Sequence, residues 1–85
     1  MIITTAYSIE GKSIKDYLGV VSAATVMVLP GGKKGIQRGW QAGVEETTEI
    51  LKQQASDLNA DAIVAIRYEP HGMNICATGT AVKLA

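Results

Sequence analysis

The sequence contains no phenylalanine and one tryptophan, and aromatic residues make up only 5% of its 85 residues. The core must therefore be built from valine, isoleucine, leucine and alanine, which suit a sheet with close approaches between elements. Apolar residues still account for 47% of the chain, which is ample for folding. A chain of this length buries only about 60 to 65% of the surface that its unfolded form exposes. We expect one small domain covering residues 1–85.

Cysteine and histidine each occur once, as Cys76 and His71. A single cysteine excludes an intrachain disulfide, and small domains are usually stabilised by disulfides, a metal or a partner subunit. The two remaining means of stabilisation are therefore a bound metal and self-association. One subunit cannot build a four-ligand metal site, because no histidine or cysteine pair has metal-ligand spacing.

The chain also lacks a charge surplus, since eight basic residues balance eight acidic ones. Phosphate binding requires basic residues concentrated on one face, so we expect no nucleic-acid partner. No apolar run approaches the length of a membrane span, and the start of the chain has no signal-peptide pattern. These absences predict a cytoplasmic protein that does not bind membranes.

The stretch from Ile36 to Tyr68 organises the predicted fold, because an amphipathic helix is followed directly by an apolar strand. Asn59 suits the left-handed conformation that ends such a helix. Gly39 and Gly43 either allow a close backbone approach or indicate a frayed first turn. The predicted buried stripe consists of Ile36, Trp40, Val44, Thr47, Leu51, Ala55 and Leu58.

Runs of β-branched and apolar residues predict strands on both sides of this helix. Pro70, His71 and Gly72 are expected to form the last chain reversal. The fold class is therefore α+β, with a mostly antiparallel sheet in the order β-β-α-β-β and one long amphipathic helix. The predicted strands are Met1–Tyr7, Ser13–Leu29, Asp61–Glu69 and Met73–Leu84.

The segment from Pro30 to Gly35 is rich in glycine and contains two lysines. The phosphate-loop pattern fails here, because Lys33 is followed by Lys34 and the glycine spacing is wrong. An anion could still bind at the N-terminus of the following helix. A solvated connection between strand and helix is the interpretation that we prefer, because such loops are common.

Three segments together resemble the YbjQ-like family, a group of small bacterial and archaeal proteins with a suggested role in heavy-metal binding. They are Thr4–Ser22, with its Ile9-Glu10-Gly11-Lys12 and Tyr17-Leu18-Gly19 motifs, Leu58–Val64, and Gly79–Val82. The resemblance implies an α+β, dodecin-subunit-like subunit that assembles into a ring, typically a pentamer. The chain departs from the family in three places. The segment between the second strand and the helix is short, Asn59 replaces a glycine, and Ala65 stands where glycine is frequent.

A homo-oligomer is also expected from the residues themselves. The run Ile63–Ile66, which includes Val64 and Ala65, places apolar side chains on both faces of a strand, whereas one helix covers only one face. The long run from Ser13 to Leu29 also leaves a strand edge that invites pairing with another copy. A closed ring would cover both surfaces.

Three functions follow from these features, and the first is the prediction. It is a non-catalytic homo-oligomer that acts as a binding or scaffold protein without a cofactor, and the family resemblance implies that the oligomer is a pentamer. The second is a protein that binds a soft transition-metal ion through Cys76 and His71, each repeated around the ring axis. The third is an enzyme, which would need a nucleophile with its base or a cofactor motif, and neither is present.

Overall fold

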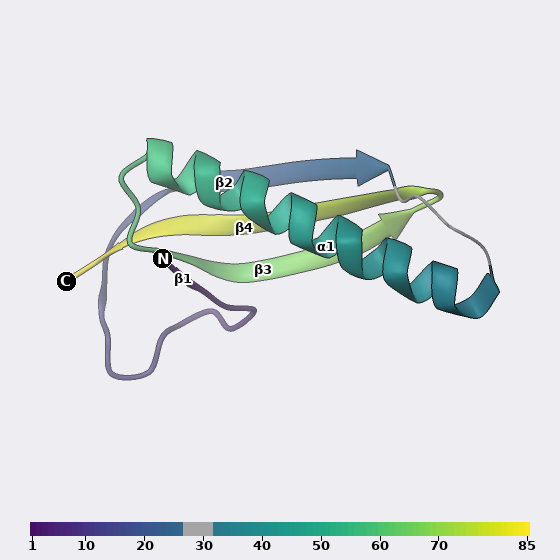
Figure 1. The fold of residues 1–85 in the computed structure, drawn as a ribbon. Helices are drawn as coiled ribbons and strands as arrows, with labels where there is room; N and C mark the ends of the chain where they lie inside the picture. The colour runs from purple at the N-terminus through teal and green to yellow at the C-terminus, as the bar shows by residue number, and fades with distance from the viewer. Residues whose placement is uncertain (27–31) are drawn as a thin grey trace.

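The structure is a computed structural model that describes residues 1–26 and 32–85. Within these ranges the order of elements is the β-β-α-β-β arrangement that the sequence predicts (Figure 1). No helix in these ranges is long and apolar enough to span a membrane. The elements are β1 (Ile2–Ile3), β2 (Ile14–Val26), α1 (Gly32–Asp57), β3 (Ala62–His71) and β4 (Asn74–Leu84).

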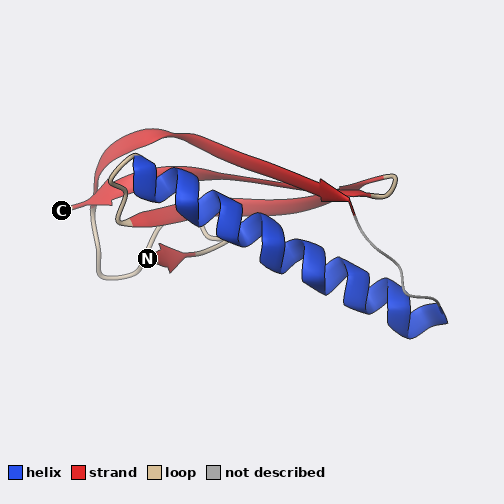
Figure 2. Ribbon diagram, turned by 45° about the horizontal axis from the view of Figure 1, so that its top comes forward, coloured by secondary structure: helices blue, strands red, loops and turns tan. Residues whose placement is uncertain are grey.

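The described strands form a mixed sheet in the spatial order β1-β3-β4-β2. Strand β4 pairs antiparallel with both β3 and β2, whereas β1 pairs parallel with β3. Helix α1 lies against one face of this sheet, so the molecule has a helical layer and a sheet layer (Figure 2). The mostly antiparallel sheet is therefore confirmed, with one short parallel strand added at its edge.

Several boundaries differ from the predicted ones. Helix α1 begins at Gly32, so Lys33 and Lys34 belong to its first turn and not to a loop. The preceding part of that loop and the predicted strand end at Met27–Leu29 lie outside the described residues. The first strand is limited to β1, and β3 continues through His71.

The last chain reversal therefore comes later in the sequence than predicted. Pro70 and His71 pair with Ile75 and Asn74 inside the β3–β4 ladder. The turn is formed by Gly72 and Met73, and Gly72 has a φ of 62°, which glycine adopts without steric cost. The sequence predicts a turn at Pro70 because proline is common in turns, but proline is also tolerated in edge strands.

The buried line of α1 agrees with the predicted stripe at Thr47, Leu51 and Ala55, and before Thr47 it is rotated by one residue. It repeats every four residues through Gly39, Gly43, Thr47, Leu51 and Ala55. Trp40 and Val44 flank this line and are half-buried. Leu58 follows the helix end and is 42% exposed, so its predicted place in the core is wrong.

Glycine at position 43 explains the rotation, because a Cβ there would overlap Ile75 Cδ1 of β4. The group that approaches Gly43 is thus a side chain of β4, whereas the sequence predicted a close backbone approach or a frayed turn. The hydroxyl of Thr47 donates to the Gly43 carbonyl at 2.8 Å, which satisfies the buried polar side chain. Asn59 has a φ of 60° and ends the helix as predicted.

Two hydrophobic clusters lie on opposite faces of the sheet. The cluster under α1 contains Val21, Leu51, Ala55, Ile63, Ile66, Ala77 and Ala81. The second cluster consists of Ala62, Val64 and Val82, with Ile9, Ile14 and Leu84 packed against it. Val64 is only 2% exposed, so the apolar patch expected at Ile63–Ile66 does not exist. The segment between β1 and β2 covers it with Ile9.

A bulge in β3 at Ala65 attaches this N-terminal segment to the sheet. Ala65 adopts a φ of 55°, and the register with β4 shifts between Val64 and Arg67. Two successive N–H groups consequently point to the N-terminal segment. Ala65 donates to the Ala6 carbonyl at 2.8 Å, and Ile66 donates to the Thr4 carbonyl at 3.1 Å. Position 65 is thus one that requires a left-handed backbone, which alanine adopts only at an energetic cost.

Asp61 fixes the other end of β3 to the end of β4. Its Oδ2 accepts the Leu84 N–H at 2.9 Å, and Lys83 Nζ lies 3.4 Å from its Oδ1. The backbone hydrogen bond from Leu84 is the main reason why the pKa of Asp61 is lowered from 3.8. The charge of Lys83 lowers this pKa further, against the opposing effect of desolvation.

Replacing Leu51 by alanine should lower the free energy of unfolding by about 2 to 5 kcal/mol, because a fully buried side chain would leave a cavity. Leu58→Ala is the matched control, and it should cost less than about 1 kcal/mol because Leu58 lies outside the buried line. Chemical denaturation measures both. Equal losses of unfolding free energy in the two variants would show that the buried face of α1 is misassigned.

Ala65→Gly should raise the free energy of unfolding by up to about 1 kcal/mol. The left-handed backbone costs an alanine about 1–2 kcal/mol, and the extra freedom of an unfolded glycine offsets part of that gain. Ala24→Gly, in the regular strand β2, should instead destabilise by about 0.5–1 kcal/mol. The same denaturation experiment compares them, and a similar loss in both variants would contradict the role of the bulge.

Asp61→Asn should lower the melting temperature at neutral pH, because the amide keeps the shape of the side chain and loses its charge. A lowered native pKa means that the ionised carboxylate stabilises the fold above its ordinary pKa, and that this contribution disappears as the pH falls through the native pKa. Melting curves between about pH 7 and pH 3 should therefore converge for the two proteins. A difference in melting temperature that stays constant over this pH range would show that the charge of Asp61 does not stabilise the fold.

Candidate binding face and metal ligands

The face of the sheet opposite α1 is covered only in part by the second cluster. Strand pairing aligns three side chains across this face in each row, for example Ala24 of β2, Cys76 of β4 and Glu69 of β3. We call the remainder the open face. It consists of Val20, Ser22, Ala24 and Val26 of β2, Asn74, Cys76, Thr78 and Thr80 of β4, and Arg67, Glu69 and His71 of β3.

The predicted metal ligands both lie on the open face, near the β3–β4 turn. Cys76 is half-buried and stands in register with Glu69. His71 is exposed, and its Nε2 lies 3.9 Å from Glu69 Oε2. Glu69 therefore neighbours both residues, although it is not among the metal ligands that the sequence predicts. The signal was available, since residues two apart in a strand share a face, but His71 was assigned to a turn.

These side chains do not form a closed metal site within one subunit. Among residues 1–26 and 32–85, no group of three or more histidine, cysteine, aspartate or glutamate residues is arranged to hold a metal ion. Cys76, His71 and Glu69 present sulfur, nitrogen and oxygen donors on one surface. A tetrahedral set would require donors from another copy of the chain.

Strand β2 brings apolar side chains into solvent at the edge of the sheet. Tyr17, Val20 and Val26 are 71%, 77% and 65% exposed. All three point to the face opposite α1, because their partners on β4 are Val82, Thr80 and Asn74. Long, exposed, apolar edge strands are unusual in monomers, because they promote association with other chains.

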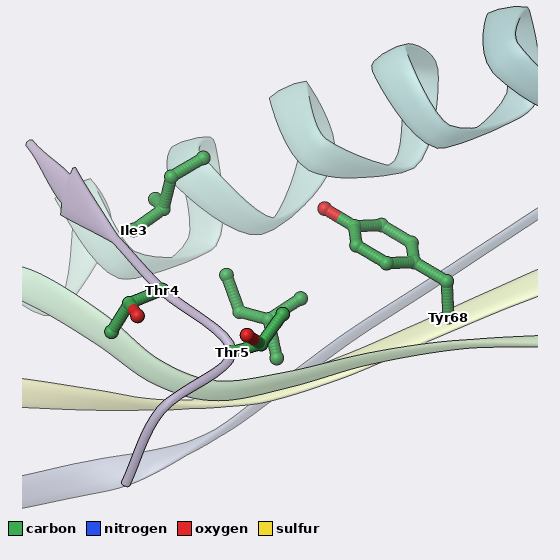
Figure 3. Close-up of a pocket in the computed structure, with 5 residues that line it drawn as sticks. Ile3, Thr4, Thr5 and Tyr68 are labelled. Carbon is green, nitrogen blue, oxygen red and sulfur yellow. The ribbon is translucent and has the colours of Figure 1, made fainter. Parts of the chain in front are cut away.

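A groove of about 330 Å³ lies between the N-terminal segment and β3. Its lining consists of Ile3, Thr4, Thr5, Ile66 and Tyr68, and Tyr68 rises from β3 towards α1 (Figure 3). The hydroxyls of Thr4, Thr5 and Tyr68 are the polar side-chain groups of this lining.

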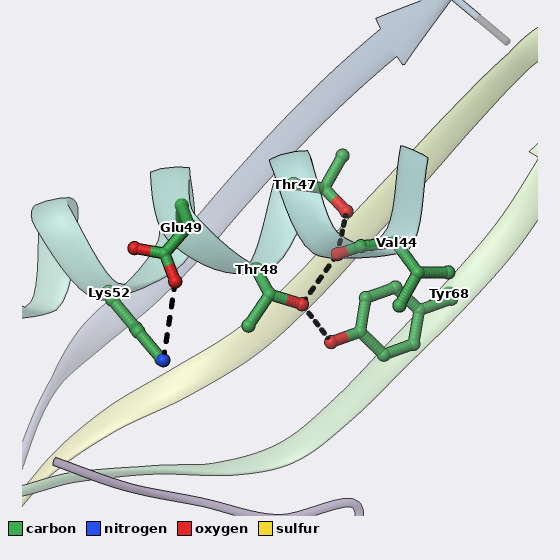
Figure 4. Close-up of polar contacts among 6 residues, drawn as sticks. All are labelled: Val44, Thr47, Thr48, Glu49, Lys52 and Tyr68. Atoms are coloured by element: carbon green, nitrogen blue, oxygen red, sulfur yellow. Dashed lines mark hydrogen bonds and ion pairs between the residues drawn. The ribbon is translucent and has the colours of Figure 1, made fainter. Parts of the chain in front are cut away.

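The Tyr68 hydroxyl is already engaged with the helix. Thr48 Oγ1 donates to the Val44 carbonyl at 2.6 Å, and it also contacts the Tyr68 hydroxyl (Figure 4). Because a threonine hydroxyl carries one hydrogen, Tyr68 must be the donor in the second contact. The contact ties β3 to α1 and supports the fold at the wall of the groove.

Comparison with known proteins relates this chain to one family. The family model described as "Putative heavy-metal-binding" (YbjQ-like) matches residues 28–85. A UPF0145 protein of Pseudomonas fluorescens (strain Pf0-1) is 34% identical over 105 aligned residues, which cover 99% of each chain. A UPF0145 protein of Legionella pneumophila (strain Corby) is 36% identical over 101 residues, covering 96% of each. Neither name states a catalytic activity.

A solved structure shows the same fold. It is a protein of unknown function of the DUF74 family from Pediococcus pentosaceus, with a TM-score of 0.73 and 24% identity. The match covers 100% of this chain and 98% of that one. The alignment of 105 positions with the Pseudomonas relative is longer than this chain of 85 residues, so that relative carries residues which are lacking here.

Proposed function

Because this chain belongs to the YbjQ-like family, we propose that it is a non-catalytic, homo-oligomeric binding or scaffold protein. The observation that supports self-association is the exposure of Tyr17, Val20 and Val26 along β2. These side chains lie on one strand and on one face, so a second copy can cover them together. The family resemblance favours a ring of five.

The contact surface differs from the one expected from the sequence. The segment containing Ile9 already covers Val64, so β3 contributes no apolar patch on that side. The surface that a second copy would bury lies on β2 and continues into the open face. A cyclic arrangement suits such a surface, because a contact between two different patches closes into a ring when the rotation permits.

A cytoplasmic location is part of this proposal. The chain has one cysteine and therefore no intrachain disulfide, as is usual for proteins of reducing compartments. A half-buried thiol at Cys76 would also remain unmodified more readily there.

Val20→Lys should convert the assembly into single chains, because a charge at the centre of the proposed contact is costly to bury. Ile50→Lys is the matched control. Ile50 is also an exposed apolar residue, but it lies on α1 and outside the open face, so this variant should keep the wild-type mass. Light scattering at low micromolar concentration measures the mass. A wild-type mass of one chain, or an assembly that tolerates Val20→Lys, would refute the proposal.

The second candidate function is binding of a soft transition-metal ion by Cys76 and His71 of several copies. It is favoured by the shared position of Cys76, Glu69 and His71 on the open face, and a thiolate with an imidazole suits such ions. Elemental analysis of the protein used for light scattering distinguishes the two candidates. Stoichiometric metal that is lost in Cys76→Ser would support metal binding, whereas a metal-free ring would support the first function.

A further inference from the structure

The side chain of Gln54 forms a pair of hydrogen bonds with the backbone of β2. Its Oε1 accepts the Ser22 N–H at 3.0 Å, and its Nε2 donates to the Ser22 carbonyl at 2.7 Å. The carboxamide has one donor and one acceptor in the arrangement of a peptide group. It therefore provides the same two contacts that a residue of an adjacent antiparallel strand would provide.

These contacts occupy the outer edge of β2. The N–H and C=O groups of one strand residue point to the same side, and successive residues alternate between the two sides. Since Ser22 directs both groups to Gln54, its groups face away from β4. By the same alternation Val20, Ala24 and Val26 also face outward. Ser22 lies within this series, so a strand added along Val20–Val26 would meet Gln54.

The exposed part of β3 at the opposite edge has a different obstacle. Ile66 donates its N–H to Thr4 of the N-terminal segment, so alternation directs the backbone groups of Tyr68 and Pro70 outward. Proline has no N–H, and it is a residue that proteins use to blunt edge strands. Within the described residues, each edge of the sheet thus carries a feature that opposes backbone pairing with another chain.

We propose that Gln54 determines how a second copy associates with β2, by closing the strand edge to backbone pairing and leaving the side chains of the open face for contact. This specificity role extends the proposed function, because it names the part of β2 that self-association uses. Strand addition to a free edge has no built-in end and can lead to open filaments, whereas a contact through side chains can close. Gln54 favours the closed form.

The test compares Gln54→Met with Gln53→Met, which places the same side chain at the neighbouring position of α1. Gln53 is exposed and donates to Asp57 within the helix, and among the described residues it has no hydrogen bond to β2, so its replacement leaves that strand unchanged. Methionine preserves length and helix propensity but lacks the carboxamide. Gln54→Ala is a second variant with high helix propensity. Light scattering across a concentration series gives the mass, circular dichroism confirms folding, and hydrogen exchange reports on the Ser22 amide.

In dilute Gln54→Met the Ser22 amide should exchange about fivefold faster than in the wild type, the factor expected for loss of one net hydrogen bond. At higher concentration the mass of the Gln54→Met assembly should rise above the wild-type mass without reaching a limit, whereas the mass of Gln53→Met should stay at the wild-type value. An unchanged mass in folded Gln54→Met and Gln54→Ala, or unchanged Ser22 exchange, would overturn the inference. A wild-type mass of one chain would refute the ring, whereas growth of Gln54→Met would still support the role of Gln54.

Discussion

The rest of the fold depends on the short distance between α1 and the sheet. Without phenylalanine, the layer between them must be thin, and Gly43 of α1 makes this possible, because a Cβ there would overlap Ile75 of β4. Gly79 of β4 leaves room for β3 in the same way, since a Cβ there would lie 2.7 Å from Ile63 Cγ2. Thr47, Leu51 and Ala55 then reach the strands directly, and the hydroxyls of Thr47 and Thr48 bond back to the helix backbone instead of remaining unpaired. Contacts that need such proximity, including those of Gln54 and Tyr68, follow from this packing.

The second face of the sheet is completed by a segment that belongs to no long element. The bulge at Ala65 exposes two N–H groups, and these hold Thr4 and Ala6 beside β3. The chain then continues to Ile9, which covers Val64 and Val82. One backbone irregularity therefore joins the edge of the sheet to its second cluster. The uncovered remainder of that face is where the candidate ligands and the exposed side chains of β2 lie together.

Hydrophobic periodicity was sufficient to predict the order of elements, the central position of Leu51 and the helix end at Asn59. In the first half of the helix it favours Trp40 and Val44 over the buried Gly39 and Gly43, because hydrophobic periodicity depends on side chains and glycine has none. Because proline favours turns, the sequence predicts that β3 ends at Glu69. The structure continues β3 to His71, and only this continuation places Glu69 and His71 on the same face. Cys76 and His71 were selected by residue type, but their shared face depends on a register that the sequence does not specify.

The parallel pairing of β1 with β3 has a consequence for the order of folding events. Ile2 pairs with Ala62, and β2 and α1 lie between these two residues along the chain. Closing such a long loop costs more entropy than joining neighbours in a hairpin, so the β3–β4 hairpin can assemble well before β1 docks. During that interval Val64 and Val82 have no cover from Ile9. Detachment of the N-terminal segment would therefore uncover apolar side chains on the second face of the sheet and favour aggregation.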